Sequence, residues 1–103
     1  MSDTSFLDYV LEQLSSVYSV SQRPMFGGDG LYLGGTFFGI VHKGMLYFRT
    51  DGTSRPKYKQ AGSRPFNPRG RTELHRYYEV PAEVMDDAEL LAIWASEAAR
   101  TGK

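Results

Sequence analysis

The 103-residue sequence contains no cysteine, only two histidines, and no apolar run long enough to span a bilayer. Without cysteine, disulfide bonds, thiolate zinc sites and thiol nucleophiles are all excluded. A membrane-spanning helix needs about 20 apolar residues, and an export signal needs a basic start followed by an apolar run. The sequence has neither feature, so we expect a cytoplasmic protein. A chain of this length is expected to fold as one domain, residues 1–103.

Side chains that carry catalysis or bind metals are also scarce. His42 and His75 are far apart in the chain and lack the spacing of metal ligands on a helix. No carboxylate pair stands out as an acid and a base, and no serine has the context of a catalytic nucleophile. The sequence therefore predicts no catalytic residue, no metal ligand and no cofactor-binding residue, and we expect that the protein is not an enzyme.

One glycine-rich stretch, residues 27–30, invites comparison with a phosphate-binding loop. Such loops need a helix to begin after the glycines, because the helix N-terminus and the glycine N–H groups converge on the anion. Residues 31–33 (Leu-Tyr-Leu) are instead typical of a strand, and the spacing fits neither the dinucleotide nor the Walker motif. We interpret Gly27, Gly28 and Gly30 as a bulge or turn. A small-molecule binder or enzyme that uses this loop remains an alternative.

The net charge of zero conceals a segregation of charge along the chain. Residues 55–76 contain seven basic side chains against Glu73 alone, and the rest of the sequence is correspondingly acidic. Such segregation can create a local field that steers an acidic partner. The basic side chains are Arg55, Lys57, Lys59, Arg64, Arg69, Arg71 and Arg76.

Aromatic side chains are interleaved with this basic segment. Exposed together, arginines and aromatic rings bind single-stranded nucleic acid by phosphate neutralisation and base stacking. The rings alternate as they would in the core of a strand, however, which favours rings that face inward and leaves only the arginines exposed. The aromatic residues concerned are Tyr58, Phe66, Tyr77 and Tyr78.

Hydrophobic periodicity and glycine turns predict an α+β fold, an antiparallel sheet with helices in the order α-β-β-β-α-β-β-α. Expected helices cover residues 4–18, 55–61 and the stretch from 86 towards the C-terminus. Expected strands cover residues 23–33, 36–42, 45–50, 65–68 and 74–80. The first strand is interrupted at Gly27-Gly28.

Further details follow from the same patterns. In the second strand, Phe38, Ile40 and His42 are expected on one face. Both faces are largely apolar, so flanking helices are expected to cover both. The pair Asp86 and Glu89 predicts a capping box at the start of the last helix. We expect Trp94 to anchor that helix on the sheet.

Two motifs at a characteristic separation carry a family resemblance. The first contains Met25, Phe26, Gly27, Gly28 and Gly30, and the second contains Tyr77, Tyr78 and Pro81, followed by a helix around Trp94. Together they resemble the N-terminal domain of the TfoX/Sxy family, bacterial regulators of DNA-uptake competence. The resemblance extends over residues 20–100 and implies a secretion-chaperone-like α+β fold without catalytic residues.

The resemblance also implies a function. Family members in competent bacteria are coactivators that work with the cyclic-AMP receptor protein and carry a second, helical C-terminal domain; here we expect a standalone N-terminal domain. The main hypothesis is a regulatory module that contacts the transcription machinery or a regulator through Arg64, Arg69, Arg71 and Arg76. The alternative is weakly specific nucleic-acid binding through the basic segment 64–76. An exposed edge of the sheet would also allow a homodimer.

Overall fold

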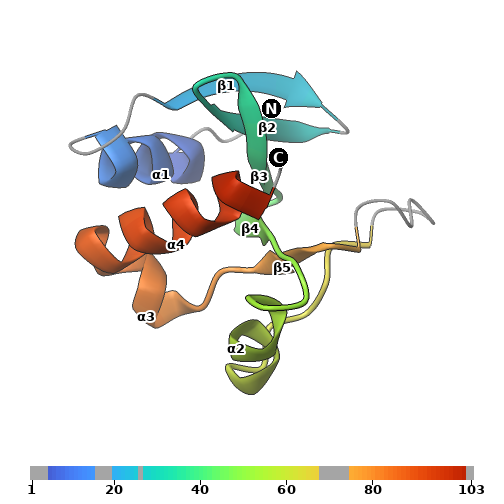
Figure 1. Cartoon of the computed structure of the whole chain (residues 1–103). Coiled ribbons are helices and arrows are strands. Elements are labelled where there is room, and N and C mark those ends of the chain that lie inside the picture. Colours follow the sequence, from blue (N-terminus) through green and yellow to red (C-terminus); the bar gives the residue numbers. More distant parts are fainter. Residues whose placement is uncertain (1–4, 16–19, 26, 68–74, 102–103) are drawn as a thin grey trace.

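The computed structural model describes residues 5–15, 20–25, 27–67 and 75–101. Within these residues one helix is followed by four strands, a helix, a fifth strand and two helices, so the α+β class and the predicted order are confirmed, apart from the differences described below (Figure 1). The elements are α1 (Ser5–Ser15), β1 (Val20–Met25), β2 (Gly28–Leu33), β3 (Thr36–His42), β4 (Met45–Arg49), α2 (Arg55–Gln60), β5 (Tyr77–Glu79), α3 (Ala82–Met85) and α4 (Ala88–Thr101).

The five strands form one antiparallel meander in which each strand pairs with its neighbour in the chain. Two of the turns have positive φ at both central residues, Gly34-Gly35 between β2 and β3 and Lys43-Gly44 between β3 and β4. This geometry belongs to the two-residue hairpin turn whose twist matches that of the strands. The glycine turns predicted from the sequence therefore set the meander.

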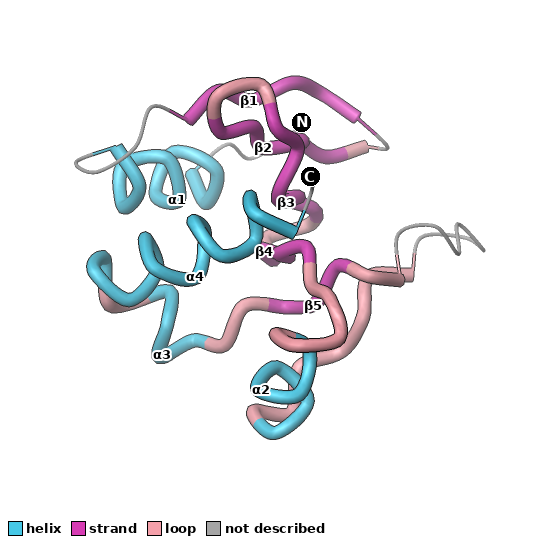
Figure 2. Tube along the Cα trace, in the orientation of Figure 1, coloured by secondary structure: helices cyan, strands magenta, loops and turns pink. Residues whose placement is uncertain are grey.

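Helices α1 and α4 lie together over one face of the sheet, while α2 lies at its end (Figures 1 and 2). Each helix presents an apolar stripe to this face, as helical spacing of buried residues requires. The resulting core consists mainly of aliphatic and aromatic side chains. Its fully buried members include Val10, Leu14, Leu31, Phe38, Leu46, Phe48 and Leu91.

The opposite face of the sheet carries a smaller apolar cluster. Ile40, Phe66 and Tyr77 are buried there, and Phe37 and Tyr47 pack against them. The prediction that flanking helices cover both faces is therefore wrong, because aromatic side chains supply the cover on this second face. We call it the aromatic face.

The strand expected over residues 23–33 is two antiparallel strands, β1 and β2, joined at Gly27. Gly27 has φ of 76°, which is a turn conformation that glycine adopts readily. The chain thus reverses where the sequence suggested an interruption, and Met25 pairs with Gly28 across the hairpin.

A β-bulge in β3 changes which residues share a face. Leu31 pairs with Gly39 and Tyr32 with Phe37, so Phe38 is an extra residue between two paired positions. Phe38 and Val41 consequently belong to the helix-covered core, whereas Ile40 packs on the aromatic face. The predicted common face of Phe38, Ile40 and His42 is therefore wrong for Phe38.

Near β5, residues 64–66 take the place of the short strand expected over 65–68. Pro65 makes a single antiparallel bridge with Tyr78, and Phe66 N–H donates to the Tyr77 carbonyl at 2.7 Å. This pairing covers the outer edge of β5. At the other side of the sheet β1 is the edge strand, where the predicted pairing between copies of the chain would take place.

The last helix is preceded by the short helix α3 and capped by Asp87 rather than Asp86. The Asp87 Oδ1 atom accepts the backbone N–H groups of Glu89 and Leu90, each at 3.1 Å. Asp87 immediately precedes α4, which is the position from which a carboxylate reaches these free donors. Asp86 instead ends α3, so the predicted pairing of Asp86 with Glu89 is wrong.

Candidate functional site

The predicted contact arginines are only partly described by the structure. Arg64 is exposed, and its Nε lies 3.7 Å from the Glu79 Oε2 atom. Arg76 is also exposed, and its carbonyl accepts the Thr50 backbone N–H at 2.9 Å and the Thr50 hydroxyl at 2.6 Å. Arg69 and Arg71 lie outside the described residues, so their part in a common surface stays a prediction.

The glycines of the first motif have a structural role in the sheet. A Cβ atom on Gly28 would collide with the Val41 carbonyl oxygen of β3, and one on Gly30 would meet the Met25 Sδ atom at 2.5 Å. Both glycines therefore permit close packing of β1, β2 and β3. This favours the turn interpretation over a phosphate-binding loop. Phe26 lies outside the described residues.

The second motif contributes to the core and to the start of α3. Tyr77 and Tyr78 are buried on opposite faces of β5, at 2% and 8% exposure. Pro81 precedes α3 in an extended conformation, with φ of −60° and ψ of 149°. Tyr58 and Phe66 are also buried, which confirms that the aromatic rings of the basic segment face inward.

Trp94 joins two helices, α4 and α2. Its ring lies 4.8 Å from the Tyr58 ring of α2, and the Lys57 ammonium lies 4.2 Å from its centroid. Lys57 also forms a salt bridge of 2.6 Å with Glu97. The buried side chains that pack α4 into the core include Leu91, Ala95 and Ala98, and the partly buried Trp94 packs against that core, so Trp94 is not the main anchor of α4.

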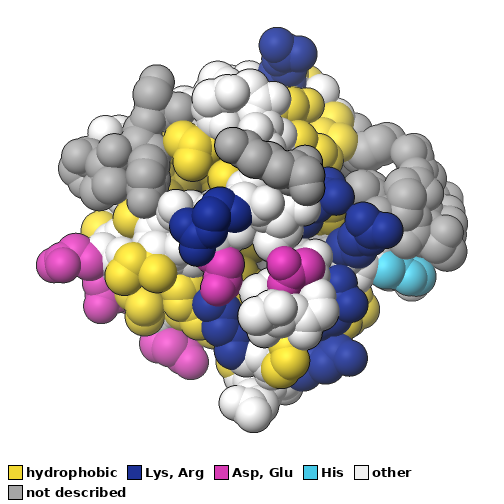
Figure 3. All heavy atoms as spheres, in the orientation of Figure 1, with side chains coloured by type: hydrophobic (Ala, Val, Ile, Leu, Met, Phe, Trp, Pro, Cys, Tyr) yellow, Lys and Arg dark blue, Asp and Glu magenta, His cyan; other side chains and the backbone are white. Residues whose placement is uncertain are grey.

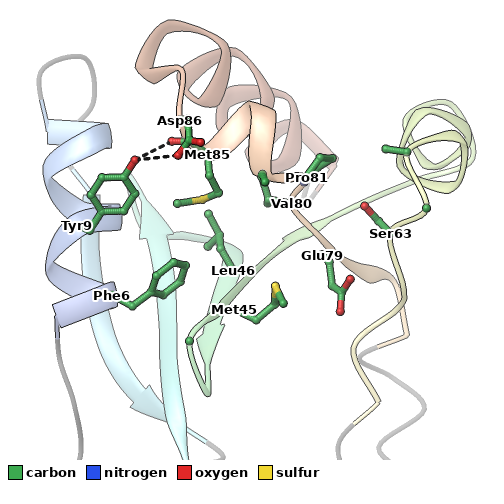
Figure 4. Close-up of a pocket in the computed structure, with 14 residues that line it drawn as sticks. Phe6, Tyr9, Met45, Leu46, Ser63, Glu79, Val80, Pro81, Met85 and Asp86 are labelled. Atoms are coloured by element: carbon green, nitrogen blue, oxygen red, sulfur yellow. Dashed lines mark hydrogen bonds between the residues drawn. The ribbon is translucent and has the colours of Figure 1, made fainter.

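A groove of about 400 Å³ lies among the described residues (Figure 4). It lies between α1, the start of β4, the end of α2 and α3. Its apolar lining points inward from all these elements and from the stretch after β5. The apolar members are Phe6, Met45, Leu46, Val80, Pro81, Ala82 and Met85.

Hydrogen bonds between α1 and α3 hold one wall of the groove. The Gln13 side-chain amide donates to the Met85 carbonyl at 2.9 Å. The Tyr9 hydroxyl donates towards the same carbonyl at 3.4 Å and towards Asp86 Oδ1 at 3.3 Å (Figure 4). Partial burial and the Asp86 carboxylate raise the pKa of Tyr9, so its hydroxyl keeps its proton and remains a donor.

The mouth of the groove combines exposed apolar groups with acidic ones. Tyr9 and Met45 remain 40% and 36% exposed, which is unusual for large apolar side chains beside a concavity. Asp86 and Glu79 also line it. Figure 3 shows acidic side chains gathered over the α3 end of the molecule and basic ones over its centre and right. An apolar side chain with basic neighbours would complement this surface.

A second hollow, of about 350 Å³, adjoins the groove and shares Met45 and Glu79 with it. It opens at the end of the aromatic face, beside the turn between β3 and β4. Two basic side chains and three aromatic or imidazole rings line it. They are Lys43, Arg64, His42, Tyr47 and Phe66.

The titratable groups of this hollow have shifted pKa values. Burial and the nearby Lys43 ammonium lower the pKa of His42, so the imidazole is neutral near pH 7. Burial and the Glu79 carboxylate raise the pKa of Tyr47, against the opposing effect of Arg64. The hollow therefore presents uncharged rings between the two cations.

No pattern in the sequence predicts the groove. Phe6, Met45, Ser63 and Met85 belong to four segments that are far apart in the chain. None of them carries a motif, and an exposed methionine such as Met45 is indistinguishable in sequence from a core methionine. Only the packing of α1 and α3 across the end of β4 brings them together.

Comparison with known protein families gives a match over most of the chain. The family model described as the TfoX N-terminal domain matches residues 12–101, which is most of the chain. A search of curated proteins returned no significant match. Within the ranges that the structure describes, no group of three potential metal ligands occurs and no helix is both long and apolar enough to cross a membrane.

Proposed function

The chain belongs to the TfoX N-terminal domain family, and on that basis we propose that it is a non-enzymatic regulatory module that acts through protein contacts in transcription. Its partner is a component of the transcription machinery or a regulator that works with it. The proposal rests on the family and places the protein in the bacterial cytoplasm. It assigns no catalytic residue, cofactor or metal.

The groove between α1, β4 and α3 is the structural observation that supports a protein contact. Its apolar lining and its exposed Tyr9 and Met45 suit the side chain of a partner. Burying one large apolar side chain contributes about 1.5–3 kcal/mol, so a groove that accepts one or two can supply a moderate, regulatory affinity. Asp86 and Glu79 at the mouth favour basic residues beside the inserted side chain.

The two histidines, the main candidates for a catalytic base, make contacts with other side chains. His42 packs edge-on against the Phe66 ring, 5.1 Å between centroids. His75 Nε2 lies 2.8 Å from the Asn67 Oδ1 atom, a contact within the loop region. Neither histidine is paired with a candidate nucleophile in these contacts, as general base catalysis requires.

The proposal is tested by measuring the affinity of the purified protein for RNA polymerase and for the cyclic-AMP receptor protein of the same bacterium. Met45→Glu places a charge in the groove, and Ala82→Gln adds polar bulk there. Both substitutions are expected to weaken binding at least about tenfold, since burial of a partner side chain is lost.

Ile93→Glu is the matched control. Ile93 is 62% exposed on α4 and does not line the groove, so the same kind of charge there is expected to leave affinity unchanged. Equal effects of Met45→Glu and Ile93→Glu, or tight binding that Ala82→Gln does not alter, would contradict the groove as the contact site. Binding to neither protein would contradict the transcriptional role.

A further inference from the structure

Two groups of aromatic rings lie on the aromatic face, and both include members of the apolar cluster that contains Ile40. Tyr32 lies 5.3 Å from Phe37, and Phe37 lies 5.3 Å from Tyr77. In the second group Tyr47 and His42 lie 4.5 Å and 5.1 Å from Phe66. Tyr77 and Phe66 are buried, whereas Tyr32, Phe37 and Tyr47 are only partly buried. The rings that reach the surface are therefore not those of the basic segment.

Cationic side chains accompany these rings. The Arg23 guanidinium lies 5.2 Å from the centroid of the Tyr32 ring. Arg49 donates to the Tyr77 hydroxyl at 3.4 Å, and its buried Nε has no acceptor. Among the described residues no carboxylate lies within salt-bridge distance of Arg23, Arg49 or Lys43. Their charge is thus not neutralised by the protein itself.

The acidic side chains lie elsewhere on the molecule. On this face Glu79 is engaged by Arg64. Exposed carboxylates are concentrated on the helices that cover the other face. They are Asp8 and Glu12 of α1, Glu83 of α3, Asp86 and Asp87 between the helices, and Glu89 of α4; among the described residues the exposed exception is Asp51, between β4 and α2. A polyanion would therefore be attracted to the aromatic face and repelled from the helical one.

We propose that the aromatic face binds single-stranded nucleic acid, with bases stacked on Tyr32, Phe37 and Tyr47 and phosphates held by Arg23 and Lys43. The hollow of about 350 Å³ beside Tyr47 and Phe66 accepts one base between the two cations that line it. Stacking needs unpaired bases, so duplex DNA is the poorer ligand. Partly exposed rings beside cations without a carboxylate partner fit the bases and phosphates of a nucleic acid better than they fit a protein segment.

The site differs from the groove. Of the residues that line the hollow, only Met45 and Glu79 also line the groove, and neither is assigned a contact with nucleic acid. Loss of one activity therefore need not affect the other. A partner in the groove and a single strand on the aromatic face could bind at the same time.

Fluorescence anisotropy with labelled oligothymidine, oligouridine and a duplex of equal length tests the proposal. We expect both single strands to bind more tightly than the duplex, with affinity that falls steeply as salt is raised. The variant Arg23→Gln/Lys43→Asn removes two cations, and asparagine tolerates the φ of 51° at position 43. Each lost phosphate contact should reduce the slope of log affinity against log salt by roughly 0.7.

The matched control is Lys59→Gln/Arg100→Gln, which removes two exposed cations from α2 and α4. It is expected to retain the slope of the unaltered protein. Tyr32→Ser should weaken single-strand binding about fivefold or more, while Tyr32→Phe, which keeps the ring, should not. Thermal unfolding of each variant shows whether it is folded. If Tyr32→Ser does not fold, the comparison of the two charge variants tests the proposal.

Three results would overturn the proposal. The first is no binding of any oligonucleotide at low salt, after which a protein would be the alternative ligand of the aromatic face. The second is an equal change of slope in the two charge variants, which would mean diffuse attraction without a site. The third is equal affinity for single strands and duplex, which would exclude stacking as the basis of binding.

Discussion

At the residue scale, Gly39 shows how closely the bulge of β3 is packed. A Cβ atom at this position would lie 3.1 Å from the Tyr47 carbonyl oxygen and 3.2 Å from Phe48 Cδ1. Both contacts are tighter than normal packing and involve parts of the sheet that move little. We predict that Gly39→Ala lowers the free energy of unfolding by about 1–3 kcal/mol, measured by urea denaturation.

Gly52→Ala is the control for this prediction. No heavy atom lies within 4 Å of a Cβ at position 52, so the substitution should be close to neutral. Because Gly→Ala by itself lowers the entropy of the unfolded chain and does not destabilise, an equal loss of stability in both variants would contradict crowding at the bulge as the cause.

His42 is the residue at which stability should respond to pH. Its pKa in the folded protein is lowered by burial and by Lys43, so the unfolded chain takes up a proton first as pH falls. Stability should therefore decrease as pH falls below the ordinary histidine pKa of about 6.5, until the folded protein is also protonated. Comparing unfolding of the unaltered protein and His42→Gln at pH values across this window checks the prediction. An identical pH dependence of both would contradict it.

At the scale of elements, α4 depends on its cap. Asp87 accepts two of the free N–H groups at the start of the helix. We predict that Asp87→Ala lowers the free energy of unfolding by about 1 kcal/mol, and that Asp87→Asn, which keeps an acceptor oxygen, costs much less. A smaller loss for Asp87→Ala than for Asp86→Ala in denaturation experiments would instead assign the cap to Asp86.

How much of these elements the sequence predicts depends on the strength of the local signal. The turns at Gly34-Gly35 and Lys43-Gly44 and the helix around Trp94 follow from local patterns and are confirmed. The β1–β2 hairpin was missed because glycines within an apolar stretch indicate a bulge and a turn equally well. The bulge at Phe38 could not be predicted. Residues 37–41 contain no polar side chain, so the sequence does not show which of them face the same side of the strand or where the alternation is interrupted.

The functional surfaces were harder to predict than the elements. From the sequence, the contact surface is predicted at the arginines of residues 64–76, because positive charge is concentrated there. Groove residues such as Phe6 and Met85 are joined only by tertiary packing. Likewise Arg23 and Tyr32 meet across the β1–β2 hairpin, whose existence was not foreseen. Partners that meet across a fold cannot be recognised before the strand pairing is known.

At the scale of the whole molecule, the sheet separates two surfaces of different character. Helices α1 and α4 cover one face, and the exposed charged side chains of these helices and of α3 are acidic except for Arg100 (Figure 1). The other face presents aromatic rings and arginines, and the groove lies at the end of β4 between α1 and α3. This arrangement suits a small adaptor that brings a protein partner and a polyanion close together.

The most direct test of the central claim is photo-crosslinking in living cells from a benzophenone side chain introduced at Ala82, in the groove, or at Ile93, on the exposed side of α4. The account predicts that the probe at position 82 crosslinks to a protein of the transcription machinery, whereas the probe at position 93 does not. Crosslinking from position 93 alone, equal crosslinking from both positions, or none from position 82 would contradict the groove as the site of partner binding.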